Sequence, residues 1–190
     1  MVFKAAKPGF LPENFCVLQP VDRSLRESQS LGRMPELSHL DESNQPRMVD
    51  VSAKAETVRE ATAQCRVTLG SDLISRMEDG ELRNKKGPVL QTAILAGITG
   101  TKKTADLIPL CHPLPLSSAQ VEILPHDEES VLVTVTAKTT SRTGVEMEAL
   151  TGASVAALTL YDMCKAANPA MIISDLKLVK KTGGKSDYQA

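Results

Sequence analysis

Apolar and polar residues alternate along four separate stretches of the chain. Apolar side chains recur at about every second position, and mostly Thr, Gln, Glu, Lys or Arg lies between them. A period of two directs alternate side chains to opposite faces, which predicts half-buried β-strands. The four stretches cover residues 59–69, 118–124, 130–139 and 171–181.

Two of these predictions need a further observation. Good helix formers in residues 55–64 favour a helix for the first stretch, but the clean alternation continues to Leu69 and favours a strand. The polar segment 125–129 separates the second and third stretches, so these two are predicted to form a β-hairpin.

Two long helices are predicted between the strands. The longer covers residues 145–167, and its repeated small side chains indicate close packing against a sheet or another helix. Asn168 and Pro169 end it, because the residue before a proline disfavours helical backbone. The other covers residues 88–99 and begins at Pro88, whose fixed φ suits the first helical position.

Shorter elements fill the space between the first strand and the hairpin. Residues 72–80 are predicted to form a short helix, with Ser71 as its N-cap and Gly80 at its end. Residues 81–87 have the composition of a charged loop, and residues 102–107 are predicted to form a further turn.

The order of these elements is strand, helices, strand, strand, helix, strand. This βαββαβ order predicts an α+β fold of the ferredoxin-like type, with an antiparallel sheet and helices packed on one face. Regular patterns begin only near Met48. Residues 1 to about 46 are therefore interpreted as an irregular or disordered extension.

Composition restricts the partners of this domain. The chain of 190 residues has a net charge of -1, contains no Trp and is only 3% aromatic. It therefore lacks the global positive charge that attracts nucleic acid or anionic membranes, and the aromatic residues on which single-stranded bases stack. No apolar run approaches the ~18 residues of a membrane span. We expect a protein that binds neither nucleic acid nor membrane.

Cysteine usage indicates the compartment. No two of the cysteines lie within four residues of each other, so no CxxC motif is present. The N-terminus also lacks the apolar core of a secretory signal and is too acidic for a typical transit peptide. We expect free thiols and a cytoplasmic location. The cysteines are Cys16, Cys65, Cys111 and Cys164.

The run LIPLCHPLPL, residues 107–116, places Cys111 and His112 in an apolar, proline-rich environment. Consecutive residues of an extended chain point to opposite sides, and no further ligands follow at zinc-finger spacing, so a shared metal ion is disfavoured. A structural histidine beside a buried thiol and a binding site are equally compatible with the local sequence. The stiff backbone that Pro109 and Pro113 impose favours the binding site slightly.

Lysines cluster beside glycines in three separate loops. Ammonium groups and exposed backbone N–H groups suit phosphates, so the clusters together favour an anionic ligand, although any single cluster is also typical of a solvated loop. The segment GGKS, residues 183–186, resembles the end of a P-loop, but Val179 stands where the first glycine is required and no helix follows.

The helix predicted over residues 145–167 has two carboxylates near its start, and a carboxylate and a lysine near its end. Asp162 and Lys165 are three residues apart, which suits either an ordinary ion pair or a proton-transfer pair. Glu146 and Glu148 suit the helix start, where the dipole favours carboxylates. Glu148 and Asp162 share a face but lie ~21 Å apart along the axis, so one small ligand meets both only if they come from different subunits.

Five segments carry a resemblance to a known family. The strings MVDVSAK, DLIPLCHPL, TGVEMEALT and YDMCKA, followed by KTGGKS, are similar to those of the cyclic pyranopterin monophosphate synthases of molybdenum cofactor biosynthesis. The resemblance runs from about Leu37 to Ser186, which implies an irregular or disordered N-terminal extension over residues 1–36 and the synthase domain over residues 37–190. It implies a lyase that converts (8S)-3′,8-cyclo-7,8-dihydroguanosine 5′-triphosphate to cyclic pyranopterin monophosphate and releases diphosphate.

The resemblance also implies an assembly and a set of site residues. It implies a cytosolic homohexamer, a trimer of dimers, with ferredoxin-like subunits and active sites at the subunit interfaces. No protein-bound metal or other cofactor is implied, although Mg²⁺ arriving with the triphosphate is compatible with it. By matching motifs, the implied catalytic residues are Asp162, Lys165 and Lys86, and the implied substrate-binding residues are Leu110, Cys111, His112, Glu146, Met147, Glu148, Lys102 and Lys181.

Two positions depart from the family pattern, and two other kinds of function stay open from the residues alone. Pro88 follows Lys86-Gly87 where the family often has aspartate, and Asp187 follows GGKS where a glycine is usual. A ferredoxin-like domain can also be a nucleotide-binding module without catalysis, since fold does not fix function. A metalloenzyme that uses Cys111 and His112 would bind stoichiometric zinc.

Overall fold

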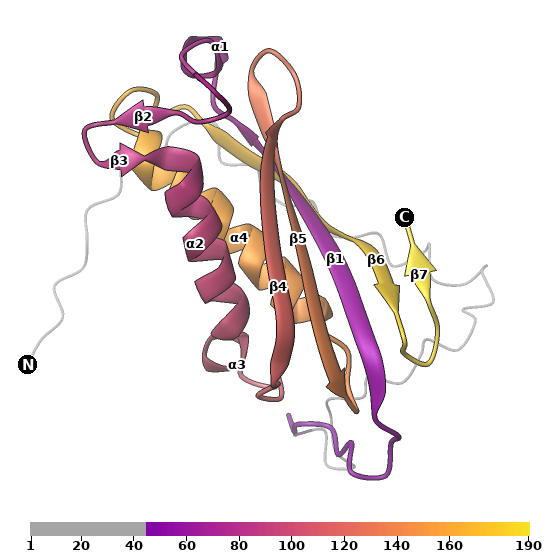
Figure 1. Ribbon diagram of the computed structural model, residues 1–190. Coiled ribbons are helices and arrows are strands. Elements are labelled where there is room, and N and C mark those ends of the chain that lie inside the picture. Colours follow the sequence, from indigo (N-terminus) through magenta and orange to yellow (C-terminus); the bar gives the residue numbers. More distant parts are fainter. Residues whose placement is uncertain (1–44) are drawn as a thin grey trace, which may run out of the picture. The chain divides into compact units, whose positions relative to one another are not determined.

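The computed structural model describes residues 45–190. The predicted extension, residues 1–36, and the start of the domain predicted for residues 37–190 lie outside the described residues. Within the described part, a single five-stranded antiparallel sheet forms one layer, and two helices cover one of its faces (Figure 1).

The strands follow the order β4-β5-β1-β6-β7 across the sheet. The four long strands arise from the four alternating stretches, and β4 and β5 form the predicted hairpin. Alternation sets the inner face of β1, where Ala61, Ala63, Cys65 and Val67 are at most 1% exposed. The strands are β1 Thr57–Thr68, β4 Leu116–Pro125, β5 Ser130–Ser141, β6 Ile172–Thr182 and β7 Tyr188–Gln189.

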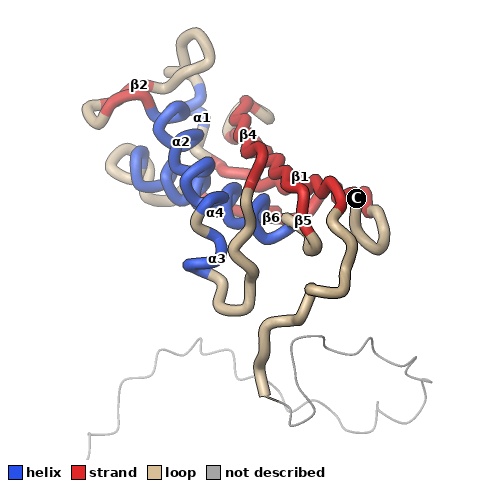
Figure 2. Tube along the Cα trace, turned by 60° about the horizontal axis from the view of Figure 1, so that its bottom comes forward, coloured by secondary structure: helices blue, strands red, loops and turns tan. Residues whose placement is uncertain are grey.

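Two long helices, α2 Val89–Lys102 and α4 Glu146–Cys164, pack against the sheet and against each other (Figure 2). With the four long strands they complete the βαββαβ order, so the predicted ferredoxin-like α+β fold is confirmed. The short helix α3, Thr104–Leu107, lies within the turn predicted for residues 102–107.

The prediction for residues 72–80 was wrong in extent. Helix α1 spans only Ser71–Ile74, and Gly70, not Ser71, occupies its N-cap position. Asp79 and Gly80 adopt φ of 51° and 74°, which turns the chain back before a longer helix can form. Residue 78 then bridges to residue 81 in antiparallel fashion.

The charged loop predicted for residues 81–87 was also wrong in part, since it carries a small hairpin. Strand β2, Arg83–Asn84, pairs with β3, Gly87–Pro88. The Glu81 carboxylate caps α2 from outside the helix, because its two oxygens accept the backbone N–H groups of Leu90 and Gln91 at 2.8 and 3.1 Å. Pro88 precedes α2 as its N-cap residue and does not begin it.

Small residues allow α2 and α4 to pack closely where they cross. A Cβ atom added to Gly97 would lie 3.1 Å from Ala156 and 3.2 Å from the Gly152 carbonyl oxygen. A Cβ atom on Gly152 would overlap the Thr101 hydroxyl and lie 3.0 Å from Val135. The small residues of α4 predicted to pack closely therefore do so, against α2 and the sheet together.

We predict that Gly152→Ala destabilises the fold. Overpacking costs about 1–3 kcal/mol, which exceeds the ~1 kcal/mol that alanine contributes over glycine in a helix. Urea unfolding at fixed protein concentration measures the change. Thr99→Ala, on the exposed face of α2, is the matched control and should leave the unfolding midpoint nearly unchanged.

The second variant, Gly152→Ala/Thr101→Ala, removes the overlapping hydroxyl and should recover part of the lost stability. A Gly152→Ala protein that is more stable than the wild type would show that the helices do not cross as closely as described.

Candidate active site

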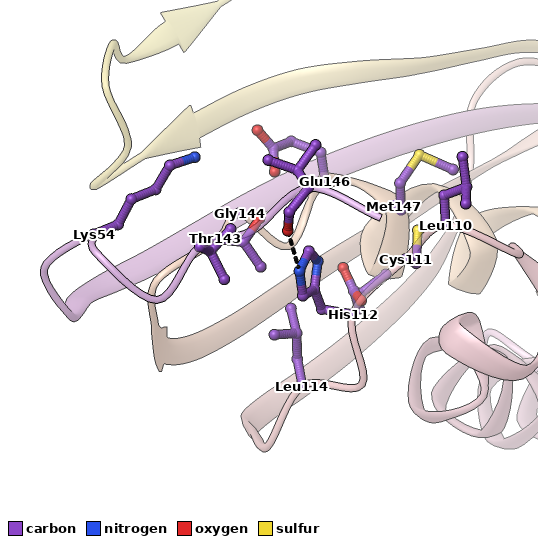
Figure 3. A pocket seen from close by; sticks show the side chains of 12 residues that line it. Lys54, Leu110, Cys111, His112, Leu114, Thr143, Gly144, Glu146 and Met147 are labelled. Carbon is purple, nitrogen blue, oxygen red and sulfur yellow. Dashed lines mark hydrogen bonds between the residues drawn. The ribbon is translucent and has the colours of Figure 1, made fainter. Parts of the chain in front are cut away.

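The predicted binding segments gather around a cavity of about 270 Å³ at the N-terminal end of α4 (Figure 3). The loop after α3 supplies one wall, and the start of α4 supplies another. Six of the predicted substrate-binding residues border this cavity: Leu110, Cys111, His112, Glu146, Met147 and Glu148.

His112 is anchored to a segment far away in the sequence. Its Nε2 atom lies 2.8 Å from the carbonyl oxygen of Val49, 63 positions earlier. A carbonyl oxygen only accepts hydrogen bonds, so Nε2 carries a proton and donates it to Val49. Nε2 is therefore occupied by the protein's own backbone.

Cys111 lies beside His112 in the same cavity wall, whereas an extended chain was expected to turn the two apart. The backbone N–H of Cys111 donates to the Ile108 carbonyl at 3.0 Å, which makes a turn and interrupts the extended course. Burial, and next the charge of Glu148, raise the pKa of the Cys111 thiol, which keeps it protonated. Within residues 45–190, no three His, Cys, Asp or Glu side chains are grouped to hold a metal ion.

The two glutamates of the cavity have different surroundings. Glu146 Oε1 lies 3.2 Å from Lys181 Nζ, so the predicted pocket lysine Lys181 reaches the cavity through this pair. Glu148 is only 4% exposed. Burial, followed by the nearby charge of Glu146, raises the pKa of Glu148. A buried carboxyl facing a cavity is suited to hydrogen bonds with the N–H groups of a heterocycle.

The three predicted catalytic residues form a cluster at the opposite end of α4. Asp162 Oδ1 lies 2.7 Å from Lys165 Nζ, and Asp162 Oδ2 lies 2.9 Å from Lys86 Nζ. Lys86 also donates to the Asp162 carbonyl oxygen at 2.9 Å. The hairpin that carries Lys86 is tied to α4 by Asn84, whose amide donates to the Met163 carbonyl at 2.7 Å.

The charges in this cluster shift its proton affinities. Hydrogen bonds from Lys165 and then Lys86 lower the pKa of Asp162 to about 2. The hydrogen bond to Asp162 raises the pKa of Lys165. At neutral pH the cluster therefore contains one carboxylate between two cations. Lys165 is the C-cap residue of α4, where the helix dipole also favours a positive charge.

Within one subunit the cavity and the cluster stay apart. Glu148 and Asp162 are fourteen positions apart on one continuous helix, which corresponds to ~21 Å at 1.5 Å per residue. Lys86 borders a different cavity of about 270 Å³ with mainly apolar walls. Lys102 borders a third cavity, beside α3, and Glu148 borders this cavity as well.

Sequence reasoning missed the residues that close the first cavity. Val49, Val51 and Lys54 border it, as do Thr143 and Gly144 from the turn before α4. The first three lie in the string MVDVSAK, which carried part of the family resemblance but no assigned role. The hydrogen bond between His112 and Val49 spans 63 positions, and no local pattern indicates it.

Comparison with known proteins identifies the family. The model of the MoaC family matches residues 48–184, which is most of the chain and includes both the cavity and the cluster. The chain belongs to the MoaC family. The resemblance seen in the sequence is confirmed.

Individual relatives agree with this assignment. The cyclic pyranopterin monophosphate synthase of Peptoclostridium acidaminophilum is 51% identical over 155 residues, which cover 81% of this chain and 97% of the relative. The protein of the same name from Heliobacterium modesticaldum is 52% identical over 156 residues, which cover 82% and 97%. No helix within residues 45–190 is long and apolar enough to span a membrane.

The cluster makes a prediction about titration. In the wild type, the Asp162 carboxyl should show no titration down to about pH 3, because its pKa is about 2. In Lys86→Met/Lys165→Met the pKa should rise to about the ordinary value of 3.8. Carboxyl ¹³C NMR measures both.

The lowered pKa of Asp162 also determines how the stability of the folded state depends on pH. Ionised Asp162 stabilises the folded state above its ordinary pKa, and this contribution is lost as the pH falls through about 2. Lys103→Met removes a lysine that pairs with Asp106 instead, and should leave the titration of Asp162 unchanged. An Asp162 that titrates near 2 in the double variant would contradict the assigned cause.

Proposed function

We propose that this protein converts (8S)-3′,8-cyclo-7,8-dihydroguanosine 5′-triphosphate to cyclic pyranopterin monophosphate, with release of diphosphate, in molybdenum cofactor biosynthesis. The observation that carries the proposal is the Asp162 carboxylate held between Lys86 and Lys165. It occurs in a chain that is about half identical to relatives named for this activity.

The cluster suits the proton transfers of this reaction. Opening the purine-derived ring and closing the pyran ring each move protons, and a positioned acid or base speeds such a step by ~10²–10⁴. In the free subunit, ionised Asp162 can accept a proton and protonated Lys165 can donate one. The Asp162 side chain is 57% exposed. Substrate or a second subunit that covers the pair would remove water from it, which raises the pKa of Asp162 and lowers that of Lys165 toward neutral pH.

The cavity suits the heterocycle of the substrate. Its buried wall offers the Glu148 carboxyl and the His112 ring, and Leu110 and Met147 offer apolar surface for a planar ring. Lysines around the site, including Lys86, Lys102 and Lys181, neutralise the phosphates as diphosphate leaves. The proposal assigns no resident metal, and Mg²⁺ would enter with the triphosphate.

A complete site then needs two subunits. The ~21 Å between Glu148 and Asp162 along α4 separates the two groups within one chain, so a second copy must supply one of them. We propose sites at subunit interfaces of a cytoplasmic homohexamer, a trimer of dimers. Large apolar side chains that are exposed in the single chain support such contacts: Val58, Leu95, Leu158, Ile172 and Leu176.

Asp162→Asn tests the proposed chemistry. The purified variant should lose at least about 100-fold in turnover of the cyclic triphosphate, because the amide neither accepts a proton nor holds the two lysines electrostatically. Formation of the pterin product and of diphosphate measures the reaction. Asp106→Asn, at the other lysine–aspartate pair of i,i+3 spacing, is the control and should retain activity. A wild type that binds the triphosphate without releasing diphosphate would identify a non-catalytic binding module.

Mixing two inactive variants tests the composite site. Asp162→Asn and Glu148→Gln, co-expressed with different affinity tags and purified over both, should regain about a quarter of wild-type activity. Random assembly leaves about one site in four with both halves intact. Each variant co-expressed with itself under two tags is the control. No recovery in a mixed oligomer would place the whole site in one subunit.

A further inference from the structure

A short segment before β1 crosses the first cavity. Residues 49–54, here called the strap, contribute Val49, Val51 and Lys54 to the lining (Figure 3). The strap has no regular pairing with the sheet. Its position therefore depends on individual hydrogen bonds from the elements around it.

Two side chains hold the strap by its backbone carbonyls. His112 Nε2 donates to the Val49 carbonyl oxygen at 2.8 Å, and Arg142 Nη1 donates to the Ser52 carbonyl oxygen at 2.8 Å. The two donors come from different parts of the fold, one from the loop after α3 and the other from the end of β5. Together they fix both halves of the strap.

Arg142 is itself well placed to hold this segment. The Arg59 guanidinium donates to the carbonyl oxygens of Arg142 and Ser141, each at 3.3 Å, which ties the end of β5 to β1. Arg142 Nε also lies 3.6 Å from the Glu56 carboxylate. Its planar group therefore contacts the chain at Ser52 and at Glu56, on either side of Lys54.

Lys54 differs from three of the lysines assigned to the site, which are held in ion pairs, and from the fourth, Lys102, which borders a different cavity. Lys181 is paired with Glu146, and both Lys86 and Lys165 are paired with Asp162. For Lys54 there is no ion pair to a carboxylate among residues 45–190. It is exposed, and its backbone N–H closes a turn on the Val51 carbonyl at 3.0 Å.

The cavity therefore has two chemically different ends. Figure 3 shows Lys54 at one end of the lining and Leu110, Cys111 and Met147 at the other. The buried carboxyl of Glu148 borders the same cavity. A ligand that combines a planar ring bearing N–H donors with an anionic tail matches this division, with its tail toward Lys54.

We propose that Lys54 binds a phosphate group of the triphosphate substrate, and that Arg142 is the positioning residue that holds Lys54 in place through the strap. This inference rests on the function proposed above. His112 shares the positioning role, because its Nε2 proton is already donated to Val49. An unpaired ammonium group on an anchored backbone suits a phosphate as a point charge.

Lys54→Met tests the binding role. It should raise the KM for the cyclic triphosphate, and the inhibition constant of inorganic diphosphate, by about tenfold or more, as expected for one charge-assisted hydrogen bond. Turnover at saturation should change much less, because Lys54 is proposed to bind a phosphate group and not to transfer a proton. Lys54→Arg restores a cation and should recover most of the loss. Lys177→Met, which removes a lysine from β6, should change neither constant.

A double-variant cycle tests the positioning role. Arg142→Met should raise the same two constants, and Arg142→Met/Lys54→Met should be little worse than Lys54→Met alone, because Arg142 then has no bound lysine to position. If the factors by which the two substitutions raise these constants multiply in the double variant, Arg142 acts independently of Lys54. That result would overturn its assigned role.

The two proposals can fail separately. If the wild type turns over and Lys54→Met leaves both constants unchanged, Lys54 binds no phosphate and the proposed function stands. If the wild type does not turn over, the proposed function fails, and calorimetry with inorganic diphosphate still tests Lys54. Equal affinity of wild type and Lys54→Met for diphosphate would then overturn the inference, and a weaker Lys54→Met would support it.

Discussion

The helix α4 is the element on which the geometry of the site depends. Its inner surface consists largely of Gly and Ala residues that contact α2 and the sheet, so the helix has little freedom to shift or rotate. One end presents Glu146 and Glu148 to a cavity, and the other presents Asp162 and Lys165 to solvent. A continuous helix keeps these ends apart, and this separation is why the proposed function includes a second copy of the chain.

Much of the fold could be predicted because period-two patterns depend on one buried face. β1 and β5 show this clearly, since alternate residues face the helices along their length. The region between β1 and α2 could not be predicted as well. There the backbone is turned by Asp79 and Gly80 and held by the Glu81 carboxylate, and these local contacts leave no periodic signal.

For the candidate site, sequence reasoning named residues that the structure brings together, but it did not predict most of the contacts between them. Spacing along one helix was sufficient to pair Asp162 with Lys165. It could not show that Lys86, 76 positions away, occupies the other oxygen of the same carboxylate. Likewise the proline-rich run marked His112 as unusual, yet the strap that it holds lies 63 positions earlier. Contacts of this kind depend on tertiary structure alone.

The electrostatics of the two ends of α4 differ, and the proposed function draws on both. At the C-terminal end of α4, one carboxylate lies between two lysines, so the cluster has a surplus positive charge that can accommodate a phosphate. At the N-terminal end, Glu148 is buried where ionisation is disfavoured, and Glu146 already has Lys181 as its partner. Donors from a heterocycle would stabilise the Glu148 carboxylate, and an anionic tail would neutralise the lysines. The proposed substrate carries both groups, and bound between two subunits, as proposed, it would satisfy both requirements at once.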